Sequence, residues 1–299
     1  MQKIIVTIPG DLSSEQVTSV YRGERPIALG SWIRPSESAT NAFYLIGKSF
    51  RLTSDPTEAT FTIASHTRYR LYVNGEYVGA GPVPGGRDCS YADSHKIASH
   101  LKKGTNHILL NVESLGVPIC SREDKTPAVN FRIEITQRKQ TVCVLSDETC
   151  KFRRNNAYLD HGGRVSEDLG FKEVYDAKAG AEMFAAPKLS DKSWKPVELI
   201  KEDDIILPRL IDPLAETTVL PVSILGVYNS PERPKDFPID DVPKAVSEAE
   251  LSPLKSGSID NAENLLTGEG AVTVKTPRSD KPVAVVLDFG RIVSGSIFI

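Results

Sequence analysis

The sequence predicts a mainly β protein, an antiparallel jelly-roll sandwich followed by the start of a second β-sandwich. Residues 60–64 and 69–73 alternate polar and apolar side chains, as strands with one buried face do. Asn74-Gly75 separates residues 69–73 from a further strand-like run at 76–78 that could pair with them. This dipeptide indicates a hairpin, because a type I′ turn needs positive φ at both central residues. Residues 129–136 alternate in the same way, which predicts a half-buried strand.

Three parts are expected along the chain: a lead-in segment at 1–30, the jelly-roll domain at 31–205, and the first part of a second, truncated sandwich at 206–299. The boundary follows the charged run 201–204, because apolar runs of a different pattern begin after it. In the last part we expect strands at 219–228, 271–275 and 283–289, and short helices at 245–254 and 260–266.

Composition excludes several classes of partner. The chain has 36 Lys and Arg against 39 Asp and Glu, a formal net charge of −3, so neither nucleic acid nor an anionic membrane is expected to bind it. No apolar run reaches transmembrane length, and the first ten residues do not form a signal peptide. We expect a soluble chain, with cytoplasm or periplasm left open. Its four cysteines lack Cys-x-x-Cys spacing, which favours free thiols over a zinc site.

An ordered series of short motifs carries a family resemblance. The motifs are Trp32-Ile33-Arg34-Pro35, then residues 44–50, 68–75, 81–82 and 101–106, then Gly170–Ala177 with its Glu-x-Tyr-Asp-Ala segment, then 190–194, 207–209 and 287–291. In this order they resemble the N-terminal region of bacterial α-L-rhamnosidases, glycoside hydrolase family 78. The resemblance covers residues 30 to 299 and implies a galactose-binding-like sandwich.

The resemblance also implies a function. Members of this family are expected to carry their catalytic acid and base in a helical domain that follows the β domains, and this chain ends at Ile299 before such a domain. The chain is therefore expected to be a non-catalytic region that supports a missing C-terminal catalytic domain of the same protein, and to be inactive alone. A rhamnose-containing glycan is its expected ligand. The alternative is a free-standing carbohydrate-binding or adhesion module, which a stop codon after Ile299 would favour.

No residue pattern indicates a catalytic group. The acidic residues show no pairing that singles out the two carboxylates of a glycosidase, and the five histidines lack the spacing of a metal site. The positions concerned are Glu113, Asp124, Glu167, Asp168, Asp288, His66, His95, His100, His107 and His161. We interpret these side chains as surface or structural groups, and Trp32 and Trp194 as packing residues.

The Gly- and Pro-rich loop 81–91 is the segment that best fits a ligand. Arg87 and Asp88 could hydrogen-bond sugar hydroxyls, and Tyr91 could stack on a pyranose face. A structural alternative pairs Arg87 with Asp88 and buries Tyr91 as a strand anchor. Asp88 or Asp93 could offer oxygen ligands to calcium, but no dense Asp/Asn run accompanies them, so no cofactor and no metal are expected.

Overall fold

The computed structural model of the 299-residue chain describes most of residues 26–229, together with 252–253, 259–275, 283–293 and 295. Within the first of these stretches it leaves out 87–88, 121–124, 139, 160–162, 165, 167, 169, 172, 185–188 and 214. Most of the expected lead-in segment and most of the expected helix at 245–254 therefore lie outside the described residues. The chain divides into two compact units, Met1–Asp212 and Pro213–Ile299. The three-part division expected from the sequence stays a prediction.

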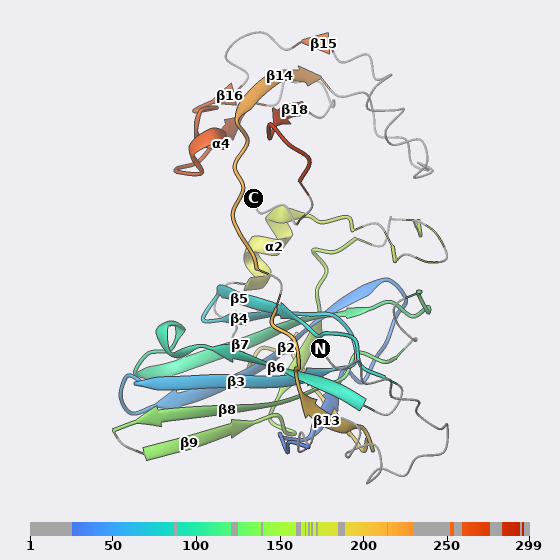
Figure 1. The fold of residues 1–299 in the computed structure, drawn as a ribbon, viewed down its shortest axis with the longest axis vertical. Helices are drawn as coiled ribbons and strands as arrows, with labels where there is room; N and C mark the ends of the chain where they lie inside the picture. The colour runs from blue at the N-terminus through green and yellow to red at the C-terminus, as the bar shows by residue number, and fades with distance from the viewer. Residues whose placement is uncertain are drawn as a thin grey trace, which may run out of the picture. The chain divides into compact units, whose positions relative to one another are not determined.

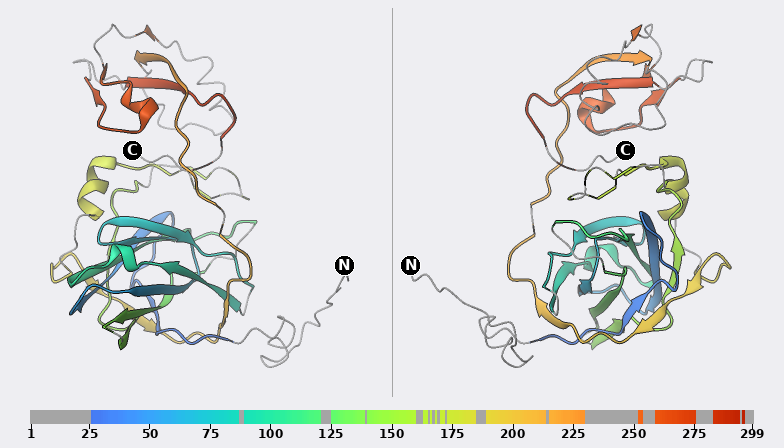
Figure 2. Two further views of the ribbon diagram at one scale, coloured as in Figure 1. Left: turned by 60° about the vertical axis from the view of Figure 1, so that its left-hand side comes forward. Right: turned by 90° about the vertical axis from the view of Figure 1, so that its right-hand side faces the viewer.

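The first unit is built on two β-sheets, called sheet A and sheet B (Figures 1 and 2). Sheet A has the order β12-β1-β8-β3-β6-β13, with β9 also paired to β8. Its strands are β1 (Trp32–Arg34), β3 (Glu58–Ser65), β6 (Cys89–Lys96), β8 (Val129–Gln137), β9 (Gln140–Leu145), β12 (Glu198–Ile200) and β13 (Ile205–Pro208).

Sheet B has the order β11-β10-β2-β7-β4-β5. Its strands are β2 (Ala42–Leu52), β4 (Tyr69–Val73), β5 (Glu76–Gly81), β7 (Gly104–Ser114), β10 (Lys151–Arg154) and β11 (Lys195–Pro196). A short 3₁₀ helix, η1 (Ala98–His100), precedes β7, and α2 (Ala177–Phe184) lies outside the two layers (Figure 1). The predicted mainly β sandwich is confirmed, while its jelly-roll connectivity stays a prediction.

The hairpin predicted at Asn74-Gly75 joins β4 to β5. Both residues have positive φ, 52° at Asn74 and 90° at Gly75, as a type I′ turn requires. The strand predicted at 129–136 is β8, in which Val129, Phe131, Ile133 and Ile135 are all buried. The predicted hairpin at Asn74-Gly75 and the predicted strand at 129–136 are therefore both present in the structure.

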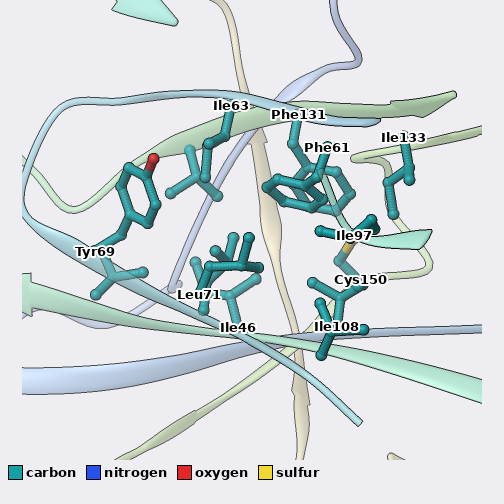
Figure 3. Packing of buried hydrophobic residues seen from close by; sticks show 14 of the residues in the cluster. Ile46, Phe61, Ile63, Tyr69, Leu71, Ile97, Ile108, Phe131, Ile133 and Cys150 are labelled. Carbon is teal, nitrogen blue, oxygen red and sulfur yellow. The ribbon is translucent and has the colours of Figure 1, made fainter. Parts of the chain in front are cut away.

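Side chains from the facing sides of the two sheets form the core (Figure 3). Phe61 of β3 and Phe131 of β8 stack with ring centroids 5.2 Å apart. From sheet B, Ile46 and Leu71 are also fully buried in this cluster. Burial of each such side chain contributes about 2 kcal/mol to folding. The sandwich is therefore a stable frame for the loops at its ends.

Strand β13 attaches the end of the first unit to sheet A. It runs parallel to β6, with Ile205 opposite Cys89 and Pro208 opposite Ala92. The amide of Arg209 then donates to the carbonyl of Ala92 at 3.0 Å. The chain thus remains part of sheet A beyond residue 205, and the pairing places the residue before β13, Asp204, beside the start of β6.

The second unit contains small β elements. Strands β14 (Ser223–Asn229), β15 (Ser252–Pro253) and β18 (Val283–Asp288) form one sheet, and β16 (Ile259–Asp260) pairs with β17 (Thr273–Val274). The helix predicted at 260–266 is shorter and later: α4 spans Asn264–Thr267, because Asp260 pairs with Thr273 in β16. That this unit begins a second sandwich stays a prediction. Among the described residues, no helix combines the length and apolar character needed to cross a bilayer.

Candidate functional site

A pocket of about 400 Å³ opens in the first unit beside β3 and β6. It is lined by the end of β3, the loop after β5, the start of β6, residues 118–120 and residue 125. The lining residues are Ser65, His66, Pro82, Val83, Pro84, Gly85, Gly86, Cys89, Ser90, Tyr91, Pro118, Ile119, Cys120 and Lys125. The predicted ligand-facing loop, residues 81–91, therefore borders a pocket.

The loop follows a cis peptide bond between Gly81 and Pro82. It returns so close to β6 that a Cβ on Gly85 would collide with the backbone carbonyl of Cys89, whereas one on Gly86 would meet open space. Tyr91 is half-buried and lines the pocket. Arg87 and Asp88, the other two predicted sugar contacts, lie outside the described residues. Sugar binding by these three residues stays a prediction.

Asp204 organises one wall of the pocket. Its Oδ2 accepts a hydrogen bond from the Ser90 hydroxyl at 2.8 Å and lies 3.4 Å from the Lys125 ammonium. The same oxygen is 3.4 Å from Nε2 of His66. His66, Ser90 and Lys125 line the pocket, so one carboxylate lies against three polar side chains of its wall.

His66 is held in place from several sides. Its backbone amide donates to the carbonyl of Ala128 at 3.0 Å, directly after β3 ends at Ser65. Its ring packs on Trp32 with a centroid distance of 4.4 Å. Burial lowers the pKa of His66 below its ordinary value; Lys125 acts in the same direction and Asp204 in the opposite one. The imidazole is therefore neutral at neutral pH.

The sequence does not indicate this wall. Its patterns predict a structural role for His66 and a domain boundary at the run 201–204. His66, Ser90, Lys125 and Asp204 come from separate parts of the chain, and the pairing of β13 with β6 places Asp204 beside Ser90. No spacing in the sequence signals such a cluster, although a charged run directly before a strand is a place to look for one.

Asp93 does not contribute to the pocket. Its Oδ2 accepts from the Tyr69 hydroxyl at 2.7 Å, and its Oδ1 accepts from Arg209 at 2.7 Å. Both oxygens are thus engaged inside the sandwich, where the residue is 2% exposed. This arrangement leaves no role for Asp93 as a calcium ligand facing the loop.

Among solved structures, the chain is similar to a family 78 rhamnosidase of Bacillus sp. GL1, with 27% identity and a TM-score of 0.59 over 69% of this chain and 22% of that chain. The resemblance expected from the sequence motifs is confirmed. The chain matches no protein-family model and no curated protein sequence.

Two further rhamnosidases share the fold at lower identity. The α-L-rhamnosidase of Dictyoglomus thermophilum is 16% identical, with a TM-score of 0.53 over 67% of this chain and 25% of that one. The Streptomyces avermitilis enzyme, complexed with L-rhamnose, is 17% identical, with a TM-score of 0.50 over 64% of this chain and 20% of that one. The chain thus spans between a fifth and a quarter of the length of these enzymes.

Proposed function

We propose that this chain is a non-catalytic, carbohydrate-related β region of an α-L-rhamnosidase-like glycoside hydrolase. The observation that carries the proposal is the similarity to the Bacillus rhamnosidase, which covers most of this chain and only 22% of that enzyme. In this proposal the sandwich supports a catalytic domain and shapes the approach of a rhamnose-containing glycan.

The pocket chemistry supports a non-catalytic role. Glycoside hydrolysis uses two carboxyl groups that face each other across the scissile bond, about 5 to 9.5 Å apart. No Asp or Glu is among the described residues that line the pocket. The nearby Asp204 accepts a hydrogen bond from Ser90 and pairs with Lys125. Among these residues the pocket therefore presents no facing pair of carboxyl groups.

An activity assay tests the non-catalytic role. The purified chain is incubated with a chromogenic aryl α-L-rhamnoside, beside an authentic α-L-rhamnosidase as positive control. We expect no turnover by the chain. Turnover that follows the protein through two orthogonal purification steps would contradict the proposal.

The pocket is the proposed place of glycan contact. Its wall offers the Ser90 hydroxyl and the Lys125 ammonium as hydrogen-bonding groups, and Tyr91 offers an aromatic ring for the apolar face of a pyranose. Tyr91→Ala is expected to weaken binding of rhamnosyl oligosaccharides at least about tenfold, because a stacked ring and its buried area are lost together. Tyr175→Ala is the matched control, because Tyr175 is 43% exposed and does not line the pocket. Equal losses in the two variants would argue against the pocket.

The alternative of a free-standing carbohydrate-binding or adhesion module makes the same prediction for Tyr91. The two proposals differ in the partner of the chain, because a free-standing module acts without a catalytic domain. The two are distinguished by whether the complete gene encodes a helical domain together with this β region.

A further inference from the structure

Three metal-ligating side chains meet beside the pocket wall. One ligand atom each from His66, Glu202 and Asp204 lies within 4.8 Å of the others. The side chains of His66 and Asp204 are 3% and 9% exposed, and Glu202 is exposed. Nε2 of His66 is buried, points at this group and makes no hydrogen bond. A buried ring nitrogen without a hydrogen bond is costly, unless a ligand uses its lone pair.

The separation of the two buried ligand atoms fits a shared ion. Nε2 of His66 and Oδ2 of Asp204 are 3.4 Å apart without hydrogen-bond geometry. Zinc bonds to imidazole nitrogen and carboxylate oxygen are about 2.0–2.2 Å long, so two ligands of one tetrahedral ion lie roughly 3.3 Å apart. An N–H···O hydrogen bond would be about 2.9 Å long. The pair is therefore spaced as two metal ligands are.

Neighbouring side chains fix the orientation of the Asp204 carboxylate and of the His66 imidazole. The Ser90 hydroxyl donates to Asp204 and fixes the carboxylate, as partners of metal ligands do. Trp32 packs on the His66 ring and fixes its orientation. The ammonium of Lys125, 3.4 Å from the same Asp204 oxygen, is a cation that competes for this position. A metal that binds here therefore has to displace this ammonium.

We propose that His66, Glu202 and Asp204 bind one divalent ion of the zinc class. A mixed nitrogen and oxygen set suits Zn²⁺, whereas Ca²⁺ takes six to eight oxygen ligands. Water completes the coordination. The ion links the end of β3 to the residues before β13, because His66 follows Ser65 and Asp204 precedes Ile205. The metal titration is carried out without sugar, so its result does not depend on the proposed sugar binding.

Zinc titration of the full chain tests the site. The tag-free, EDTA-treated protein at pH 7.5 is titrated with Zn²⁺ in competition with a chromophoric chelator, and one ion per chain is expected. Glu202→Gln removes the exposed ligand without touching the core, and should weaken affinity about tenfold or more. Asp203→Asn is the matched control, since this neighbouring exposed carboxylate is outside the cluster, and should leave affinity unchanged. No binding, or equal affinities of the Glu202→Gln variant and the unmodified chain, would overturn the proposal.

Two further measurements separate this site from the cysteines. Cys89 and Cys120 line the neighbouring pocket and are also candidate zinc ligands. Co²⁺ bound by nitrogen and oxygen alone gives no thiolate-to-cobalt charge-transfer band, and we expect none. An intense band would place the ion on the thiols and contradict the proposal. Lys125→Met removes the competing ammonium and should tighten zinc binding several-fold; weaker binding would count against the site.

Discussion

Arg209 donates from Nη1 to Oδ1 of Asp93 at 2.7 Å, and this pair joins the segment after β13 to β6. The two side chains are 15% and 3% exposed. The second carboxylate oxygen of Asp93 accepts from the Tyr69 hydroxyl at 2.7 Å. One buried carboxylate therefore links both sheets to the last segment of the first unit.

Loss of the arginine should destabilise the first unit. Arg209→Met leaves the Asp93 charge buried with Tyr69 as its remaining hydrogen-bond donor here, and we expect a loss of about 3 kcal/mol in the free energy of unfolding. The double variant Arg209→Met/Asp93→Asn also removes the unpaired Asp93 charge. Its free energy of unfolding should be no lower than that of Arg209→Met alone. Urea unfolding followed by tryptophan fluorescence measures this, because Trp32 and Trp194 both lie in the first unit. A single variant within about 0.5 kcal/mol of the unmodified chain would contradict the expectation.

The loop beside the pocket offers a pair of matched substitutions. A Cβ at position 85 collides with the backbone carbonyl of Cys89, and one at position 86 meets nothing within 4 Å. Gly85→Ala should therefore displace the loop and weaken glycan binding, whereas Gly86→Ala should leave it unchanged. Sugar titration and a circular dichroism melt of both variants provide the check. Equal affinities would show that the loop does not form the binding site.

The thiols should fall into two classes. Cys120 and Cys143 are exposed, while Cys89 and Cys150 are buried. Burial raises the pKa of Cys150 to about 11 and raises that of Cys89 as well, so both remain protonated and unreactive at pH 8. We expect two thiols to react rapidly with a disulfide reagent in the native protein, and four in denaturant. Rapid reaction of all four in the native state would contradict the described packing.

Features encoded locally were predictable from the sequence. Asn74-Gly75 specifies its hairpin through two positive φ angles, and the alternation at 129–136 specifies one buried face of β8. The parallel pairing of β13 with β6 was not predictable, because it depends on residues far apart in the chain. The polar wall at Asp204 depends on that pairing, so it was missed for the same reason.

Only the part of the candidate site that has a local sequence pattern was predictable. Density of glycine and proline marks 81–91 as a loop with special geometry, and the structure places that loop at a pocket. Two other residues that line the pocket, His66 and Lys125, are not marked by any local sequence pattern. Asp260 illustrates the converse case: a helix-like stretch begins there, but pairing with Thr273 makes the residue part of a strand.

Chemical-shift mapping of the purified chain with L-rhamnose and rhamnosyl oligosaccharides, with D-glucose as control, tests glycan binding at the pocket most directly. We expect saturable shifts for the amides of Val83, Gly85, Tyr91 and Lys125, and none for residues in the middle of β2. Shifts confined to another surface, or a flat titration of the folded protein, would contradict glycan binding at this pocket.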